Sequence, residues 1–256
     1  MKKALIAAIL LLAAAVTAWL FHSRPEQGED PGNLHLYLND TYEMVRLGEH
    51  SAALERYIWF HEHALEHDPH MLGVRLSYSL SDWRQLADVY PPAMEAMIAT
   101  RDRVAAQIRA GQGSWDLFQD LQALNEKLDD EPMTVELFKH LHATQPSFAK
   151  RVWRLASNHV IAAGEYEMAR HYVGDPIQTL AHYRRSYEGR IAHSVRDEDQ
   201  EFREFREKHA RNHFVDQTLE LMQLFSALDE EHLVNQIGTK ALETLNDPRI
   251  KQAMQP

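Results

Sequence analysis

From residue 33 onward, apolar residues recur every three to four positions, which places them on one face of an α-helix. A long run of this kind comprises Leu72, Leu76, Leu80, Trp83, Leu86 and Tyr90. Prolines and glycines interrupt the pattern at short intervals and divide it into many helices, as at Pro91-Pro92 and at Gly111 and Gly113. No stretch alternates apolar and polar residues in the way a strand does. The pattern therefore predicts an all-α fold for residues 33–256.

The first 24 residues have a different pattern, an almost unbroken apolar run. Two lysines precede 18 residues, Ala4 to Phe21, that only Thr17 interrupts. As a helix this run covers about 27 Å, which is sufficient for a bilayer core of roughly 30 Å. We therefore expect residues 1–24 to form a signal anchor, that is, a transmembrane helix. The acidic residues 25–32, which contain proline and glycine, would be a linker.

The two N-terminal lysines predict the orientation of this anchor. Positive residues tend to stay on the cytoplasmic side, so the rest of the chain is expected to be exported. This gives a single-pass protein of the bacterial inner membrane with its C-terminal domain in the periplasm. Cleavage near Ala18, where small residues occur, is the alternative and would release the chain into the periplasm. Trp19 to Phe21 prolong the apolar run past that point and favour the uncleaved anchor.

A shared layout of residues occurs twice in the helical part. In the first copy, Tyr37 precedes Gly48 by eleven residues and Ala53 follows it by five. The same spacing in the second copy is formed by Trp153, Gly164 and Ala169. A glutamate follows each glycine. An aromatic residue can fill the space between two paired helices, glycine permits a tight turn, and a small residue lets the helices approach.

This layout resembles the tetratricopeptide repeat (TPR) family, whose units are antiparallel helix pairs of about 34 residues. The segment Ala64-Leu65-Glu66, followed by Asp68-Pro69, is similar to the end of that repeat. The resemblance implies a TPR-like array over residues 33–256, an α-solenoid or right-handed helical superhelix. The two glycines lie 116 residues apart, and the helix pairs expected between them lack the signature. A divergent helical bundle or a related solenoid is the alternative architecture.

The resemblance also implies a binding face. Arg151, Arg154 and Asn158 share a helical face distinct from that of Trp153. In the resembling family this face of the first helix of a pair lines a concave groove, where a basic residue and an asparagine one turn later hold peptide carboxylates. Guanidinium and amide donors a turn apart are suited to that task. We therefore expect a non-enzymatic scaffold that binds acidic or carboxylate-bearing segments of protein or peptide partners in the cell envelope. The alternative is that Arg151, Arg154 and Asn158 form a helical face that is only solvated.

Trp59 is a second candidate for partner binding. It stands between Ile58 and Phe60, and three successive large apolar residues cannot all face one neighbouring helix. Burial of the helix on two sides would accommodate all three. Exposure of Trp59 would instead indicate a partner surface.

The mixed-charge segment 196–211 follows a short helix that we expect to stop near Gly189. The mixed charges predict a largely solvated helix for this segment. Phe202 and Phe205 give this segment a narrow apolar edge. We expect this edge to dock on the body of the protein, and contact with a partner is the alternative.

Composition and charge narrow the functional classes. The formal net charge is -11, or -13 without the two N-terminal lysines, and such a body repels phosphate backbones, which disfavours nucleic acid as a partner. Cysteine is absent, which excludes disulfides, cysteine nucleophiles and thiolate zinc sites. There is neither a G-x-S-x-G motif nor a phosphate-binding glycine loop. The sequence thus predicts a protein that is not an enzyme and needs no cofactor.

The histidines of the chain suggest metal binding as the alternative function. The chain has sixteen, and the densest group is His61, His63, His67 and His70. Within it, His63, Glu66 and His67 fit H-x-x-E-H, which in one metalloprotease class places two zinc ligands on one helical face beside a glutamate. The same residues also occupy the end of the first repeat, where polar side chains would point to water. The alternative is therefore a periplasmic metal-binding protein or zinc hydrolase, whereas the main prediction has no metal site.

Overall fold

A computed structural model describes residues 32–196 and 199–255, and this part of the chain consists of helices and turns without a strand. The predicted all-α class is confirmed for these residues. The anchor expected at residues 1–24 and all but the last residue of the linker lie outside them. Among the described helices, none has both the length and the apolar character needed to cross a bilayer.

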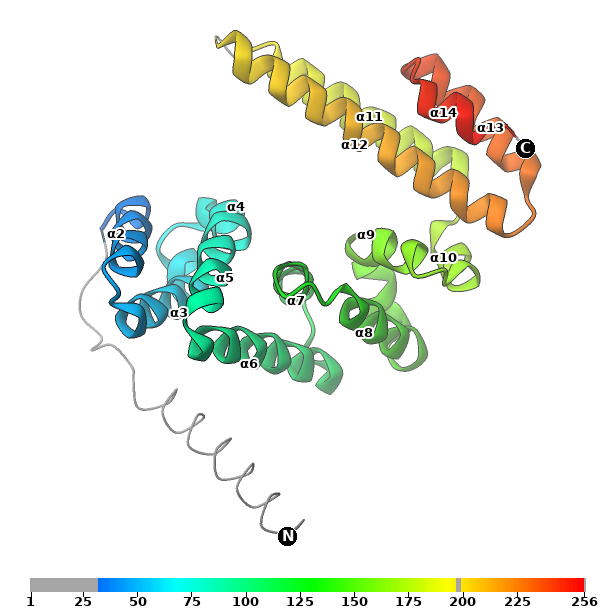
Figure 1. Cartoon of the computed structure of the whole chain (residues 1–256). Helices are drawn as coiled ribbons and strands as arrows, with labels where there is room; N and C mark the ends of the chain where they lie inside the picture. Colours follow the sequence, from blue (N-terminus) through cyan, green and yellow to red (C-terminus); the bar gives the residue numbers. More distant parts are fainter. Residues whose placement is uncertain (1–31, 197–198, 256) are drawn as a thin grey trace. The chain divides into compact units, whose positions relative to one another are not determined.

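The chain divides into two compact units, and the boundary falls inside helix α6 (Pro91–Gln107). Unit 1 ends at Thr100 and contains α2 (Leu34–Arg46), α3 (His50–His67), η1 (Pro69–Met71), α4 (Leu72–Val74), the π-helical turn η2 (Arg75–Ser79) and α5 (Leu80–Val89). Unit 2 continues with η3 (Ile108–Gln112), α7 (Trp115–Lys127), α8 (Glu131–Thr144), α9 (Pro146–Ala162), α10 (Tyr166–Val173), α11 (Pro176–Ser194), α12 (Gln200–Ala227), α13 (Glu231–Thr244) and α14 (Pro248–Ala253) (Figure 1).

Four helix hairpins share one turn geometry: α2 with α3, α7 with α8, α9 with α10, and α12 with α13. In each, a residue of positive φ ends the first helix: Gly48 (83°), Asp129 (53°), Gly164 (79°) and Asp229 (58°). The next residue is acidic, and its N–H donates to the carbonyl five residues earlier: Glu49 to Met44 at 2.9 Å, Asp130 to Asn125 at 2.9 Å, Glu165 to Val160 at 3.1 Å and Glu230 to Phe225 at 2.9 Å. This bond is the hallmark of a Schellman turn, which satisfies the carbonyls at a helix end.

The turn geometry of the two copies found in the sequence therefore recurs in two further hairpins, of which only α7–α8 also has an aromatic residue eleven positions before the turn. Phe118 and Thr134 stand at the same distances from Asp129 as Tyr37 and Ala53 do from Gly48. The α7–α8 hairpin has neither the glycine nor the alanine of the two copies, but it shares their turn geometry, because aspartate also tolerates the left-handed backbone conformation. Asp129 and Gly164 are 35 residues apart, close to one repeat length.

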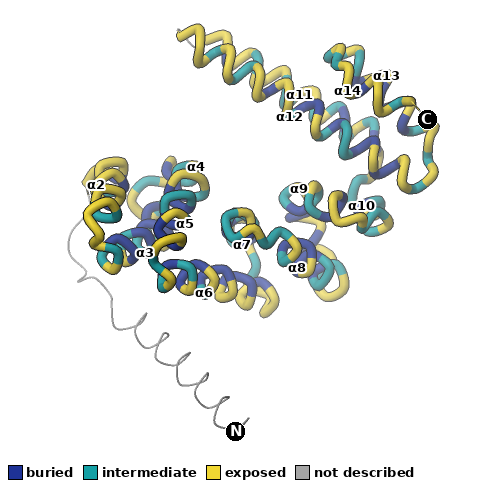
Figure 2. The backbone as a smooth tube through the Cα atoms, in the orientation of Figure 1, coloured by how far each residue is buried: buried dark blue, intermediate teal, exposed yellow. Residues whose placement is uncertain are grey.

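The small or medium-sized residue five positions after each turn lies in the core, where the two helices of the hairpin approach. The four residues are Ala53, Thr134 and Ala169, each 0% exposed, and Val234, 2% exposed. In unit 2 the core is one continuous apolar cluster that runs from the end of α6 to α14 (Figure 2). The hairpins of unit 2 are thus joined by a shared core and are not separate pairs.

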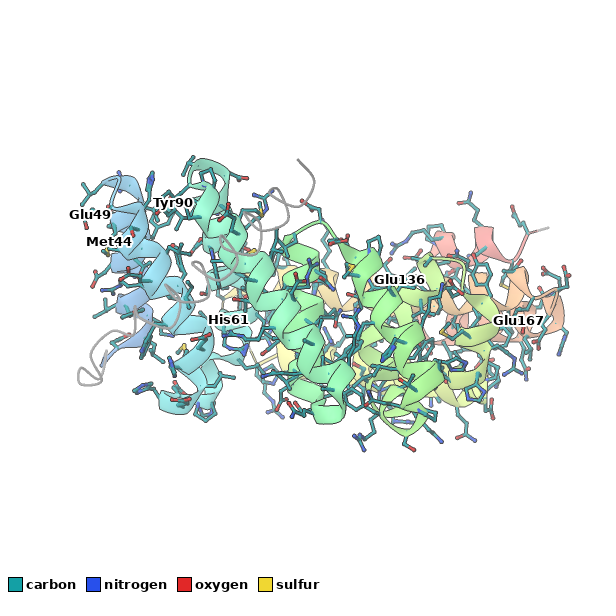
Figure 3. All side chains as sticks on the ribbon, turned by 90° about the horizontal axis from the view of Figure 1, so that it is seen from below. Met44, Glu49, His61, Tyr90, Glu136 and Glu167 are labelled. Carbon is teal, nitrogen blue, oxygen red and sulfur yellow. The ribbon has the colours of Figure 1, made fainter. Side chains whose placement is uncertain are left out.

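Unit 1 encloses polar groups beside its core. The side chain of Arg75, in η2, is buried and its Nε donates to the carbonyl oxygen of His61 at 2.8 Å. His61 belongs to α3 and is itself buried, whereas Glu49, in the α2–α3 turn, is exposed (Figure 3). This bond ties η2 to α3 through the backbone.

Helices α11 and α12 pack along each other and differ from the sequence prediction in two respects. The helix expected to stop near Gly189 continues to Ser194, because a single glycine lowers helix propensity without ending a well-packed helix. The expected docking of Phe202 and Phe205 on the body is wrong, since their exposed fractions are 52% and 65%.

Candidate functional site

The first binding candidates lie together on α9. Its buried stripe comprises Phe148, Ala149, Val152, Trp153, Ala156, Val160 and Ile161. The helical period therefore directs Arg151, Arg154 and Asn158 away from the core, and all three are exposed. We call these three residues the α9 polar face. Its geometry agrees with the shared helical face expected from the sequence.

The polar ends of the α9 polar face form no hydrogen bond or ion pair with the described residues. Across residues 32–196 and 199–255, no hydrogen bond or ion pair joins the side chains of Arg151, Arg154 or Asn158 to another residue. The guanidinium carbon of Arg151 lies 5.2 Å from the centroid of the Phe148 ring, a stacking contact that leaves its N–H groups accessible. Arg154 and Asn158 are one helical turn apart, so both can donate to one bound group.

A second polar cluster adjoins this face through His159, the residue after Asn158. The His159 Nε2 atom lies 3.3 Å from Gln122 Nε2 and 3.5 Å from Glu126 Oε1, both on α7. The Gln122 amide also donates to Glu126 Oε1 at 3.1 Å. The hydrogen bond from His159 is the main cause that holds the pKa of Glu126 below its ordinary value, although partial burial opposes it. These contacts fix the position of α7 beside α9.

Helices α11 and α12 supply further titratable groups near the α9 polar face. Burial raises the pKa of Tyr183 on α11 to about 12; the Glu220 carboxylate adds to this shift, and the Arg154 guanidinium opposes it. Burial also raises the pKa of Glu220 on α12, with a contribution from the Asp216 carboxylate, while His159 lowers it. These effects place Tyr183 within electrostatic range of both Arg154 and Glu220.

The arrangement combines donors and acceptors from several helices. Arg154 and Asn158 offer donors for a carboxylate, and Glu220 offers an acceptor for N–H groups. No described residue in this region forms a nucleophile and base pair at hydrogen-bonding distance, as acyl transfer would need.

Trp59 lies in unit 1, on α3, and is half-buried. Its ring centroid is 5.1 Å from that of Tyr37, 5.7 Å from that of His63 and 5.4 Å from that of His67. Of its two neighbours in sequence, Phe60 is fully buried and Ile58 is half-buried. Trp59 thus belongs to an aromatic and histidine cluster of unit 1, whereas the α9 polar face belongs to unit 2.

The H-x-x-E-H residues occupy the same cluster. His63 Nδ1 lies 3.3 Å from Glu66 Oε2, and the rings of His63 and His67 both pack against Trp59. In the described part of the chain, no three histidine or acidic side chains converge as metal ligands would. A pocket of about 490 Å³ opens beside His67 and is lined by Gly32, Asn33, Leu34, His35, His67, Asp68 and Met71.

Sequence reasoning missed the residues around the α9 polar face: Gln122, Glu126, His159, Tyr183 and Glu220. They come from four helices, and nothing in their local sequence connects them. The likeness of the α7–α8 turn to the turns at Gly48 and Gly164 could have been found by allowing aspartate at the position of the turn glycine. Comparison with protein-family models, with curated proteins and with solved structures finds no match to this chain.

Proposed function

We propose that this chain is a non-enzymatic TPR-like scaffold whose α9 polar face binds acidic or carboxylate-bearing peptide segments of a protein partner. The observation that carries the proposal is the pair Arg154 and Asn158, which lie one turn apart, are exposed and have no side-chain hydrogen bond to any other described residue. Charge-assisted hydrogen bonds from a guanidinium are stronger than those between neutral groups, so this face favours anionic segments. The four hairpins of one turn geometry support the repeat architecture that the proposal assumes.

The partner is expected in the cell envelope. Residues 1–24 are proposed to anchor the chain in the bacterial inner membrane, with residues 33–256 in the periplasm. Release into the periplasm after cleavage near Ala18 is the alternative. The intact mass of the exported chain separates the two, because the uncleaved chain is 29.6 kDa and cleavage near Ala18 removes about 2 kDa, at roughly 110 Da per residue.

Peptide binding to the full chain tests the proposed face. The probe is a fluorescein-labelled decapeptide ending in three acidic residues with a free C-terminal carboxylate. Its matched control replaces each acidic residue with its amide and carries an amidated C-terminus. We expect the full chain, kept in non-ionic detergent, to bind the acidic peptide at least about tenfold more tightly than the control peptide.

Two variants connect this binding to the α9 polar face. The double substitution Arg154→Ala with Asn158→Ala should raise the Kd for the acidic peptide by about tenfold or more. Arg185→Ala is the matched control, because Arg185 is an exposed arginine on α11. Equal binding of both peptides, or equal binding by wild type and the double variant, removes the proposal.

A further inference from the structure

Helix α12 carries an apolar edge that unit 2 does not cover. Phe202 is 52% exposed and Phe205 is 65% exposed. Their contacts are polar groups of the same helix: the Arg206 guanidinium carbon lies 5.4 Å from the Phe202 ring centroid, and the His209 ring stacks on Phe205 at 6.5 Å. Two exposed phenylalanines three residues apart form one apolar patch, and covering such a patch is favourable.

The opposite side of α12 is already used in packing. Ala210 and Phe214 are buried, and the Phe214 ring lies 5.3 Å from the ring of Tyr187 on α11. Because α11 packs along this side, rotation of α12 to bury Phe205 would expose Phe214 instead. The apolar edge is therefore a fixed feature of the packed hairpin.

Charged and polar residues extend the edge into a stripe. Glu201, Phe205, Lys208 and Asn212 recur at intervals of four, three and four residues, which places them on one side of α12, and all four are exposed. We call these four residues the α12 stripe. Within the α12 stripe, Glu201 and Lys208 lie on opposite sides of Phe205 along the helix. Two α12 stripes in antiparallel orientation would therefore have complementary charges.

We propose that the α12 stripe binds the α12 stripe of a second copy of this chain in antiparallel orientation. The midpoint between Glu201 and Lys208 falls beside Phe205. A two-fold axis at this point therefore brings the two Phe205 rings together and sets Glu201 of each copy opposite Lys208 of the other. Such a contact is isologous, because the same surface is used on both copies.

The charges of the α12 stripe favour a second copy of the chain over a lipid surface. A lipid surface of anionic headgroups would select a basic stripe, whereas the α12 stripe carries one acid and one base. The chain has a formal net charge of -11, so two copies repel each other in most orientations. In the antiparallel arrangement, the acid of each stripe faces the base of the other stripe. This inference does not depend on the proposed peptide binding.

Charge reversal tests the orientation directly. Sedimentation velocity of the full chain in non-ionic detergent gives the dimer Kd for wild type, Glu201→Lys, Lys208→Glu and the double variant. Each single reversal sets like charges opposite each other and should raise the Kd by about threefold or more, whereas the double variant should return to within about twofold of wild type. Glu243→Lys, an exposed change on α13, is the control and should resemble wild type.

The apolar centre is tested by Phe205→Ser, which should raise the Kd by at least about tenfold. Because Phe205 is exposed, this variant should keep the helical circular dichroism and melting temperature of wild type. A monomeric wild-type chain, or a dimer whose Kd none of these substitutions changes, overturns the proposal. A dimer formed by the N-terminal apolar run alone would keep the same Kd in all these variants and would therefore also overturn the proposal. Loss of vesicle binding in Phe205→Ser with an unchanged dimer Kd would assign the surface to lipid and also overturns it.

Disulfide trapping locates the contact. The native chain has no cysteine, so single introduced cysteines report one position each. A chain with Glu201→Cys mixed with a tagged chain with Lys208→Cys should form a mixed disulfide under mild oxidation, at least about tenfold faster than either forms one with a Lys240→Cys chain. Equal rates with the α13 control would contradict the antiparallel contact.

Discussion

Arg101 and Asp130 form an ion pair that ties the end of α6 to the α7–α8 turn, with Arg101 Nη1 2.9 Å from Asp130 Oδ2. The same Nη1 donates to Asn125 Oδ1 at 3.1 Å, and Asn125 Nδ2 donates to Thr134 Oγ1 at 2.9 Å. Burial opposes the charge on Arg101, but hydrogen bonds from its guanidinium to Asp130 and Asp102 outweigh that effect, so the pKa of Arg101 is raised. The network thus connects a charged arginine to the threonine at the hairpin crossing.

Removal of Arg101 should destabilise unit 2. The side chain of Arg101 is only 8% exposed, and Asn125 is fully buried, so Arg101→Ala leaves the buried Asn125 carbonyl without its donor. We expect a loss of about 2–4 kcal/mol in the free energy of unfolding, measured by urea denaturation. Arg109→Ala, at an exposed arginine of η3, should change it by less than about 0.5 kcal/mol. Equal effects of the two substitutions would contradict the role given to the network.

The turn geometry predicts opposite effects for two glycines. Gly164 has a φ of 79°, whereas Gly189 lies inside α11 with no heavy atom within 4 Å of an added Cβ. Gly164→Ala should therefore destabilise the protein by about 1 kcal/mol, and Gly189→Ala should stabilise it by about 0.5–1 kcal/mol. Thermal denaturation followed by circular dichroism measures both. A stabilising Gly164→Ala would refute the turn assignment.

The aspartate turns allow the reverse substitution. Asp129 has a φ of 53°, a backbone conformation that costs free energy for any residue with a Cβ. Asp129→Gly should therefore stabilise the α7–α8 hairpin by a few tenths to about 1 kcal/mol. The control is Asp116→Gly, an exposed aspartate in the first turn of α7, which should destabilise by a similar amount. Urea denaturation of both variants is the measurement.

Glu220 predicts a pH dependence of stability. Its pKa is raised in the folded state, first by burial and then by Asp216, so ionisation of Glu220 destabilises the fold. This destabilisation is complete at a pH above the folded-state pKa of Glu220. It decreases as the pH falls below that pKa, and it is absent below the ordinary pKa of 4.5, where the carboxyl group is protonated in both the folded and the unfolded state. Glu220→Gln should thus stabilise the protein at pH 7, and its advantage should shrink as the pH approaches 4.5.

The matched control for this substitution is Glu243→Gln, at an exposed glutamate of α13. Its effect on the free energy of unfolding should be small and should not depend on pH between 4.5 and 7 to the same extent. If Glu220→Gln destabilises the protein at pH 7, then the Glu220 carboxylate is needed in its ionised form, and the burial argument is wrong.

The histidine cluster of unit 1 permits a direct test of the metal-binding alternative. Because His63 and His67 pack against Trp59 and no three ligands converge among the described residues, chelation should leave the melting temperature of the full chain unchanged. Elemental analysis of protein purified without a histidine tag completes the test. One zinc per chain, lost on His63→Ala but not on the control His232→Ala, would instead favour the metal-binding protein or hydrolase.

The helices were predictable because their signals are local. Apolar spacing identified the helical segments, and prolines marked where several begin, such as Pro91, Pro146 and Pro176. The α9 polar face could be assigned to one side of a helix from the 3.6-residue period alone. The likeness of the α7–α8 hairpin to the two copies was missed because the layout was defined with glycine at the turn, although the geometry requires only a residue that tolerates positive φ.

The sequence by itself determined the all-α class, the hairpin turns at Gly48 and Gly164, and the grouping of Arg151, Arg154 and Asn158 on one helical face. Each depends on residues within about one or two helical turns. Only the tertiary structure decided which groups surround that face, because Glu126, Tyr183 and Glu220 come from different helices. It also decided that Phe202 and Phe205 stay exposed. Their helix must bury one side against α11, and the deeper apolar stripe around Phe214 takes that side because its burial removes more apolar surface from water.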